Sequence, residues 1–329
     1  MRNDAGERSL ETGQSDGDAI VDIAESVMTA CWLEGPVCTL EQEVYFTDVR
    51  GNRILRMDAA GRLSTFRGPE YANYPNGQAL DRSGCLLTCE AGDPATGAPP
   101  RVTRTDLRTG AVEVVIDSFE GSQLSGPSDI VVDRQGCIFF TDAVRPFFLP
   151  PLTGTAGSSS RRSLESTSVF RISPCGAVSR LLGDGAVLSP NGIGLSPDDR
   201  TLYVVENDIR ANAVRQLRAF DVSHDGVASN MRVVRDFSPG RSADGLTVDC
   251  DGNLYVAAGL NHLRGTDETL DTVAGIHVLS VDGALRRIIR IWEDSVTNVT
   301  FGGPDLRTLY ITAGKSVFTF RNDSAGARR

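Results

Sequence analysis

The stretch SDIVVDRQGCIFFTD, residues 128–142, decides the fold. It opens on a polar residue, Ser128, and continues as an apolar run up to Asp133. A turn containing Gly136 follows, and a second apolar run ends in an acid, Asp142. Two short apolar runs around an Asp/Gly turn are typical of antiparallel strands joined by a tight hairpin. The stretch therefore predicts a hairpin that begins with a polar residue at one face of a sheet.

The same pattern recurs in five further stretches of the chain. They are EGPVCTLEQEVYFTD from Glu34, NGQALDRSGCLLTCE from Asn76, NGIGLSPDDRTLYVVE from Asn191, DGLTVDCDGNLYVAA from Asp244 and NVTFGGPDLRTLYITA from Asn298. Each of the first five repeats is followed by a second hairpin, which gives four strands per repeat. Repeats of about 40 to 60 residues in a β-rich chain are typical of propeller blades. The sequence predicts an all-β fold, a six-bladed β-propeller with four-stranded blades.

The sixth repeat has its inner hairpin and one further strand, at 316–320. An unpaired sheet edge there would be an aggregation hazard. The apolar segment 19–28 can supply the missing strand, so we expect an N-terminal strand to close the ring. The expected organisation is a polar, disordered tail at 1–17, one propeller domain at 18–323 and a C-terminal tail at 324–329.

The charge of the chain narrows the classes of partner. Its 33 basic and 43 acidic residues give a net charge of −10, which disfavours nucleic acids and anionic membranes. No stretch approaches the ~18 uninterrupted apolar residues of a membrane span. Seven cysteines without metal-finger spacing, and no signal-peptide pattern, favour reduced thiols and a cytoplasmic location. We expect a small-molecule substrate, no nucleic acid or membrane partner, and a monomer or weak homo-oligomer.

The first residue of each repeat opens an innermost strand, so these residues should meet around the propeller axis at one face. We call them the ring residues: Glu34, Asn76, Ser128, Asn191, Asp244 and Asn298. Because a hairpin returns to the face where it began, the acids that end the second strands should lie at the same mouth. These strand-end acids are Asp48, Glu90, Asp142 and Glu206. The long connections 91–100, 143–167, 207–214 and 259–273 leave the blades there as well, and such loops are typical of a functional face.

All six ring residues carry side-chain oxygen atoms. Calcium-like cations take about six to eight oxygen ligands, including carboxylates and amide carbonyls. Zinc is disfavoured because His224, His262 and His277 lack metal-binding spacing and Cys-x-x-Cys is absent. A GxSxG elbow and a phosphate loop are absent too. Asn-Gly and Asp-Gly pairs are also common in turns, so a structural role stays open for the ring residues that precede a glycine.

Six motifs, in this order, resemble the senescence marker protein/gluconolactonase/luciferin-regenerating enzyme family. They are EGP at Glu34, FTD ending at Asp48, GPSDIVVD around Ser128, PNGIGLSPD around Asn191, ADGLTVD around Asp244 and the final TLYITA. The resemblance implies a six-bladed propeller that opens lactones with a divalent metal, typically Ca²⁺. It implies Glu34, Ser128, Asn191 and Asp244 as metal ligands. Ser128 stands where the family usually has asparagine, and Gly126 stands where its sugar-lactone members tend to carry arginine.

The predicted function is metal-dependent hydrolysis of a small lactone or ester. The metal would polarise the carbonyl, and Asp244 would act as general base as well as ligand. Substrate-binding roles are predicted at the mouth for Asn76, Asn298, Phe147, Phe148 and His262. The strand-end acids are expected to support the ring residues from behind.

Two alternatives stay open. A strictosidine-synthase-like propeller would join or rearrange a small molecule with a pocket carboxylate and without a metal. A non-catalytic propeller would bind its ligand and leave it unchanged. Metal content distinguishes the hydrolase from the first alternative, and turnover of a small ester distinguishes it from the second.

Overall fold

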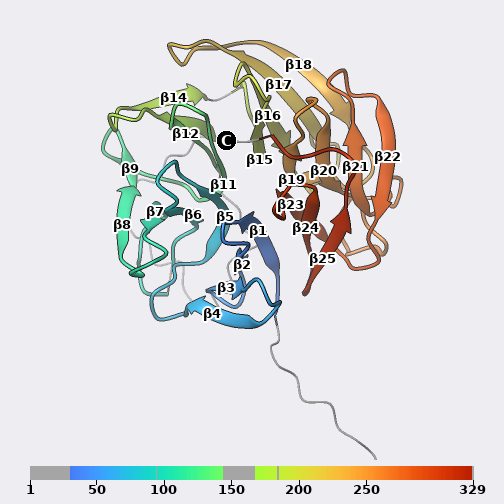
Figure 1. Ribbon diagram of the computed structural model, residues 1–329. Helices are drawn as coiled ribbons and strands as arrows, with labels where there is room; N and C mark the ends of the chain where they lie inside the picture. Colours follow the sequence, from blue (N-terminus) through green and yellow to red (C-terminus); the bar gives the residue numbers. More distant parts are fainter. Residues whose placement is uncertain (1–29, 94, 144–166, 184, 328–329) are drawn as a thin grey trace, which may run out of the picture.

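The computed structural model describes residues 30–93, 95–143, 167–183 and 185–327. In these residues the chain forms six blade sheets arranged in sequence order around a common axis, and one small two-stranded sheet (Figure 1). Each sheet is an antiparallel meander, in which consecutive strands are hydrogen-bonded neighbours. The prediction of a six-bladed β-propeller is confirmed.

The strands of the blades occupy four positions, counted outward from the axis. The innermost strands are β1 (Leu33–Cys38), β5 (Pro75–Leu80), β11 (Pro127–Val132), β15 (Pro190–Leu195), β19 (Ala243–Val248) and β23 (Val296–Gly302). The second strands are β2 (Val44–Asp48), β6 (Leu86–Glu90), β12 (Ile138–Asp142), β16 (Thr201–Glu206), β20 (Leu254–Ala258) and β24 (Thr308–Ala313). The third strands are β3 (Arg53–Met57), β7 (Arg101–Thr105), β13 (Ser168–Ile172), β17 (Gln216–Val222), β21 (Gly275–Leu279) and β25 (Ser316–Arg321). The outermost strands are β4 (Leu63–Arg67), β8 (Val112–Ile116), β14 (Val178–Leu182), β18 (Ala228–Asp236) and β22 (Leu285–Arg290), and a small hairpin, β9 (Ser118–Phe119) and β10 (Ser122–Gln123), follows β8.

The sixth blade differs from the other five. Its described strands, β23 to β25, form a three-stranded sheet. The segment 19–28, expected to be its fourth strand, lies outside the described residues, so closure by the N-terminus stays a prediction. Blades six and one also contact each other directly. The Thr297 hydroxyl donates to the Leu33 carbonyl at 2.7 Å, and the Leu33 N–H donates to the Gly314 carbonyl at 2.8 Å.

The inner hairpins turn on the residues that the repeat indicated. In blade three, Asp133 Oδ1 accepts hydrogen bonds from the N–H groups of Gln135 and Cys137, at 2.9 and 2.8 Å. Gly136 has a φ of +91°, a conformation that glycine adopts without steric cost. Asp81 and Asp249 cap the corresponding turns of blades two and five in the same way. These aspartates therefore shape the hairpins, at the opposite end of the inner strand from the ring residues.

Apolar side chains from the inner strands hold neighbouring blades together. Blades two and three share a cluster that includes Phe140 and Phe170, whose rings stack with centroids 5.2 Å apart. The outermost strands are more exposed, as in β4, where the first three residues face solvent. Since buried apolar area contributes about 25 cal/mol per Å², this packing is what holds the inner strands in register around the axis.

The residues that follow β25 remain attached to the propeller. The Cys250 N–H donates to the Ala325 carbonyl at 2.9 Å, and the Ala327 N–H donates to the Val248 carbonyl at 3.1 Å. The Gly326 N–H donates to Leu306 at 2.8 Å. The ordered chain therefore continues beyond 324, where a tail was expected to begin.

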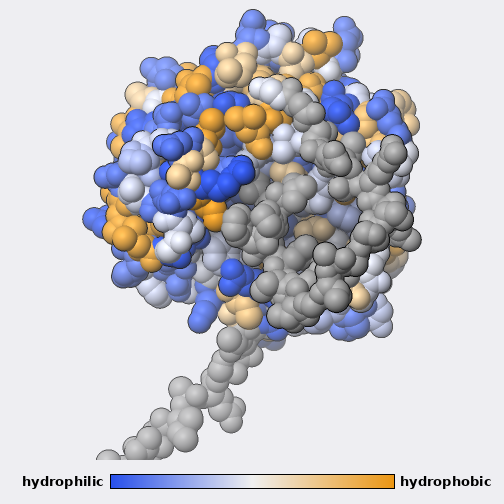
Figure 2. All heavy atoms as spheres, turned by 180° about the vertical axis from the view of Figure 1, so that it is seen from behind, coloured by the Kyte–Doolittle hydropathy of each residue, from blue (hydrophilic) through white to orange (hydrophobic). Residues whose placement is uncertain are grey.

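The surface of the described residues is mixed in character. They include no helix that is long and apolar enough to cross a membrane. Figure 2 shows the side opposite to that of Figure 1, and hydrophilic and hydrophobic side chains are interspersed over its described part. Exposed apolar side chains such as Leu188, Leu263 and Trp292 lie in connections between strands.

Candidate active site

Each inner strand contains a β-bulge close to its ring residue. In blade three, Pro127 pairs with Asp142 and Ile130 with Phe140, so Ser128 and the residue after it oppose a single residue of β12. Blades two, four and five have the same register shift at the ring residue, and blades one and six shift beside it. Bulges re-aim side chains and are frequent beside active sites. Here they allow polar side chains to face the adjacent blades from strands that otherwise build the core.

The glycines that follow four of the ring residues are required by close packing. A Cβ placed on Gly77, Gly192 or Gly245 would lie closer than 3.0 Å to atoms of the next blade's ring segment. None of these three glycines has a positive φ, so they are not turn residues. Gly35 is equally crowded, by the Asn76 carbonyl. The interpretation of the Asn-Gly and Asp-Gly pairs as turns is therefore wrong. They mark the points where the inner strands approach one another most closely.

Side-chain hydrogen bonds link ring residues from blade to blade. Asn76 Nδ2 donates to Ser128 Oγ at 3.4 Å, and Ser128 Oγ donates to Asn191 Oδ1 at 2.8 Å. Asn191 Nδ2 donates in turn to Asp244 Oδ1. Across the junction of blades six and one, Asn298 Nδ2 donates to Glu34 Oε2 at 3.3 Å. All six ring residues are exposed by 6% or less, so the sequence placed them correctly in one buried ring.

A seventh residue, Asp129, belongs to the ring and was missed from the sequence. It is buried and accepts hydrogen bonds from the N–H groups of Ile130 and Ile193, at 3.0 and 3.4 Å. Burial raises the pKa of Asp129 to about 7, and repulsion from Asp244 raises it too. Four other blades carry glycine at this position, directly after the ring residue. That exception in the repeat was the signal that could have revealed it.

Below the ring, a cavity of about 210 Å³ continues along the axis. Asp129, Asn298 and Gln78 contribute the polar part of its wall, and Leu306 and Ala327 line it as well. Leu306 lies in the connection between β23 and β24, so the cavity leads away from the mouth toward the opposite face. The ring residues therefore lie between the mouth and this inner cavity.

Glu34 is a buried carboxylate whose hydrogen-bond donors are neutral. It accepts from the Gly35 N–H at 3.1 Å and from the Asn298 amide. Burial raises the pKa of Glu34 well above its ordinary value, and repulsion from Asp244 and Asp129 raises it further. A positive charge placed among these three carboxylates would relieve both effects.

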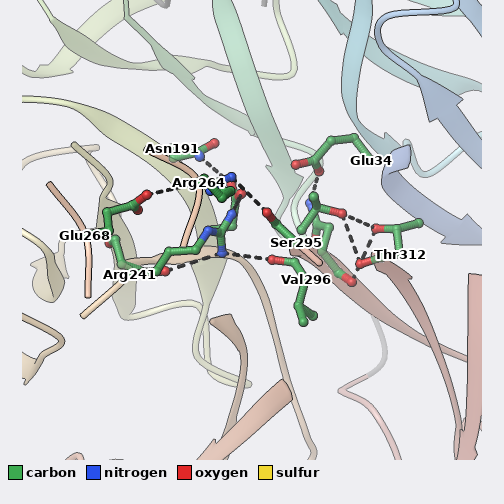
Figure 3. Close-up of polar contacts among 12 residues, drawn as sticks. Glu34, Asn191, Arg241, Arg264, Glu268, Ser295, Val296 and Thr312 are labelled. Carbon is green, nitrogen blue, oxygen red and sulfur yellow. Dashed lines mark hydrogen bonds and ion pairs between the residues drawn. The ribbon is translucent and has the colours of Figure 1, made fainter. Parts of the chain in front are cut away.

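Asp244 has a cationic partner that the sequence did not reveal. Arg241 Nη2 lies 2.6 Å from Asp244 Oδ2, and both side chains are almost completely buried. Arg241 Nη1 also donates to the Val296 carbonyl at 3.0 Å (Figure 3). Close by, Arg264 Nη1 donates to Ser295 Oγ at 2.8 Å, and its Nη2 pairs with Glu268 at 2.7 Å. Two arginines therefore lie beside the junction of blades five and six, because both are anchored on consecutive residues of blade six.

The strand-end acids secure the segments that lead into the inner strands. Asp48 accepts from the Cys31 and Trp32 N–H groups, both at 3.0 Å. Asp142 and Glu206 accept in the same way from the N–H groups of residues 125–126 and 188–189. Glu90 instead pairs with Arg67 and Arg101 and accepts from Thr103. Burial raises the pKa of Asp142 to about 6, and its N–H donors counteract this. These contacts hold the segments that lead into the inner strands, and a role in supporting the ring residues stays a prediction.

The predicted substrate-binding residues that the structure describes lie in different parts of the protein. His262 is 84% exposed, and its Nδ1 lies 2.9 Å from Asp294 Oδ2, so it belongs to the rim. Phe147 and Phe148 lie outside the described residues, and their role stays a prediction. Asn76 and Asn298 lie in the ring itself, hydrogen-bonded to Ser128 and Glu34.

The donor chemistry of the ring suits a divalent cation that prefers oxygen. Within the described residues no three Asp, Glu, His or Cys side chains form a metal site by themselves. Amide and hydroxyl oxygens lie between the carboxylates around the ring, and calcium accepts such mixed sets together with water. Asn191 here presents its nitrogen to Asp244, but amide nitrogen and oxygen are assigned from the hydrogen-bond network. A rotated amide would present oxygen to the cation, and the Ser128 hydroxyl can donate or accept in response.

Comparisons with known proteins agree with this architecture. A family model described as the SMP-30/Gluconolactonase/LRE-like region matches residues 32–315. The gluconolactonase of Zymomonas mobilis subsp. mobilis is 25% identical over 94% of this chain and 85% of that protein. Pentonolactonase XacC of Haloferax volcanii is 26% identical over 88% of this chain and 84% of that protein. The solved structure of XC5397, a gluconolactonase from Xanthomonas campestris, superposes with a TM-score of 0.69 at 27% identity and covers 89% of this chain and 86% of that one.

Proposed function

Because the chain belongs to the SMP-30/gluconolactonase/LRE-like family, we propose that it hydrolyses a small lactone at the buried ring, with a divalent cation held by Glu34, Asn191 and Asp244. The observation that carries the proposal is the group of buried carboxylates, Glu34, Asp129 and Asp244, whose mutual repulsion calls for a cation. Full-length relatives with lactonase names support the reaction class.

The reaction adds water to the lactone carbonyl and breaks the ring C–O bond, which yields a hydroxy acid. A bound divalent cation supplies Lewis-acid polarisation of the carbonyl and increases the acidity of water. Asp244 lies in the ring with Oδ1 toward Asn191, and in the proposed mechanism this oxygen takes the proton from the attacking water. The same proton is then available to the leaving ring oxygen.

Residues in the ring and beside it fix the geometry of the reaction. Arg241 Nη2 lies 2.6 Å from Asp244 Oδ2, so the carboxylate keeps one orientation while Oδ1 accepts the proton. Asn76 and Ser128 extend the hydrogen-bonded row around the mouth and offer groups that can bind substrate hydroxyls. The burial of the ring limits competition from bulk water.

The proposal is tested by metal analysis of the purified protein and by a panel of sugar and aliphatic lactones, assayed with chelator and after calcium is restored. We expect chelator to abolish hydrolysis and calcium to restore it, with calcium binding measured separately by titration calorimetry. Hydrolysis that persists in excess chelator would support the metal-independent carboxylate mechanism instead. Metal binding without turnover of any lactone or ester would indicate a ligand-binding propeller.

A further inference from the structure

Arg241 is the largest of the fully buried side chains in the described part of the chain, with an exposure of 2%. It precedes β19, and its guanidinium reaches across to blade six (Figure 3). Nη2 pairs with Asp244, Nη1 donates to the Val296 carbonyl, and Nε has no hydrogen-bond partner among the described residues. A buried guanidinium is costly unless a charge compensates it, and Asp244 supplies that charge.

The ion pair with Arg241 involves one oxygen of Asp244, and the other oxygen is directed into the ring. Arg241 occupies Oδ2, whereas Oδ1 faces Asn191 and the rest of the ring. When ionised, the three carboxylates of the ring together with this guanidinium carry a net charge of −2. That charge is equal and opposite to the charge of a divalent cation. Without the arginine, the ring would carry one more uncompensated negative charge, at Asp244.

We propose that Arg241 is a resident cation of the metal centre, which sets its affinity for divalent ions and holds Asp244 in place before the metal binds. The inference rests on the proposed function, because it presupposes that the ring binds a divalent cation. Arg241 contacts a ligand of that cation, so it is a positioning residue. The arginine lowers the affinity for calcium, because its positive charge lies next to Asp244, a ligand of the bound ion, and repels that ion. In return, it stabilises the metal-free propeller.

The test compares calcium binding and thermal stability in Arg241→Met, Arg241→Gln and Arg241→Lys. The two uncharged variants should bind calcium about tenfold more tightly than the unmodified protein in titration calorimetry. Their Tm in chelator should fall, and calcium should recover most of that loss, because a ligand of the native state stabilises it by mass action. Arg241→Lys keeps the charge and should bind calcium within about threefold of the unmodified protein.

Arg218→Met is the matched control. Arg218 is also buried and pairs with the strand-end acid Glu206 at 3.0 Å, outside the ring. Its replacement should lower the Tm, but calcium should not narrow the difference from the unmodified protein.

Several outcomes would overturn the inference. One is an unchanged or weaker calcium affinity in both uncharged variants. Another is a failure of both variants to fold even with calcium present, since the metal should replace the missing charge. If the unmodified protein itself bound no divalent cation, the proposed metal centre would fail first, and the two failures are therefore distinguishable.

Discussion

Two rows of buried acids lie at the same end of the propeller, and they differ in how their charge is satisfied. The outer row consists of the strand-end acids, which accept backbone N–H groups or pair with arginines. The inner row consists of Glu34, Asp129 and Asp244. Of these, Asp244 pairs with Arg241, whereas the donors to Glu34 and Asp129 in the described structure are neutral. Burial raises the pKa of both.

This difference in charge compensation distinguishes acids that stabilise the fold from acids that take part in binding or catalysis. A buried carboxylate with complete hydrogen bonding stabilises the fold and has little reason to react. A buried carboxylate without a compensating charge costs stability, and such costs concentrate at functional sites. The inner row therefore marks the site of ligand binding and catalysis, and the outer row marks the framework that positions it.

The largest contrast is expected between Asp244→Asn and Asp48→Asn. Asp244→Asn removes the proposed base and a metal ligand, so kcat/KM for the best lactone should fall by about 10³-fold or more. Asp48→Asn weakens the acceptor for two backbone N–H groups just before β1 and removes the ion pair with Arg53, so it should lower the Tm and leave kcat/KM of the folded protein within about threefold. Lactone hydrolysis followed by pH-stat gives kcat/KM for both variants, and thermal unfolding gives their Tm. An active Asp244→Asn variant would contradict the assignment.

A second contrast uses the two buried glutamates. Glu34→Gln removes a charge that has no cationic partner among the described residues, so the metal-free protein should become more stable, while calcium affinity should fall by about 100-fold. Glu90→Gln breaks ion pairs to Arg67 and Arg101, so it should destabilise the protein and leave calcium affinity unchanged. Thermal unfolding in chelator and calcium titration provide the two readouts. Equal signs of the stability change in the two variants would contradict the distinction between the rows.

Much of this architecture could be predicted because the repeat contains it six times. The Asp/Gly turns fix where the inner hairpins of blades two, three and five reverse, and the period places Glu34 and Asp244 at equivalent points of different blades. Convergence of the ring follows from that equivalence alone. The acids at the ends of the second strands are placed by the same reasoning, because a hairpin returns to its starting face.

The remainder depends on contacts between blades, which spacing does not encode. Arg241 meets Val296 across the junction of blades five and six, and Arg264 meets Ser295 there. The partners lie more than 30 positions apart in non-repeated connections, so no sequence pattern pairs them. Asp129 is hard to recognise from the sequence for another reason, because it lies at the start of an apolar strand. Four other blades have glycine at this position. The close approach of Gly77 to the backbone of Asp129 shows that the inner strands pack tightly here, so a charged side chain at this position is unusual.

The third prediction concerns the pH dependence of the inner row. The pKa of Asp129 is about 7 in the folded protein and near 4 when exposed, so the native state holds this proton more tightly. In chelator, stability should therefore be highest at the acidic end of a pH 5 to 7.5 series and should fall as Asp129 ionises, by about 2 kcal/mol. Asp129→Asn should remove this part of the slope, and saturating calcium should reduce it. Urea unfolding across the series measures the effect, and an identical slope in Asp129→Asn would contradict it.

The smallest expected effect distinguishes residues within the ring. Ser128 is fully buried and lies between two amides, accepting from Asn76 and donating to Asn191. Its hydroxyl is short, and its backbone cannot move toward the axis freely, because it packs closely against Gly77. Ser128→Asn would extend an amide oxygen from the same place, so calcium affinity should rise about three- to fivefold.

Ser128→Ala tests the same position in the opposite direction. It removes the hydroxyl, so Asn191 loses a donor and the amide row is interrupted between blades two and four. Calcium affinity should fall by a small factor, with the Tm in chelator lowered by the buried amide left without its partner. Both variants are compared by calorimetric titration at one ionic strength, because long-range charge effects are screened by salt. The order expected is Ser128→Asn, then the unmodified protein, then Ser128→Ala. If Ser128→Asn bound calcium no more tightly than Ser128→Ala, the side chain at position 128 would contribute no ligand to the cation.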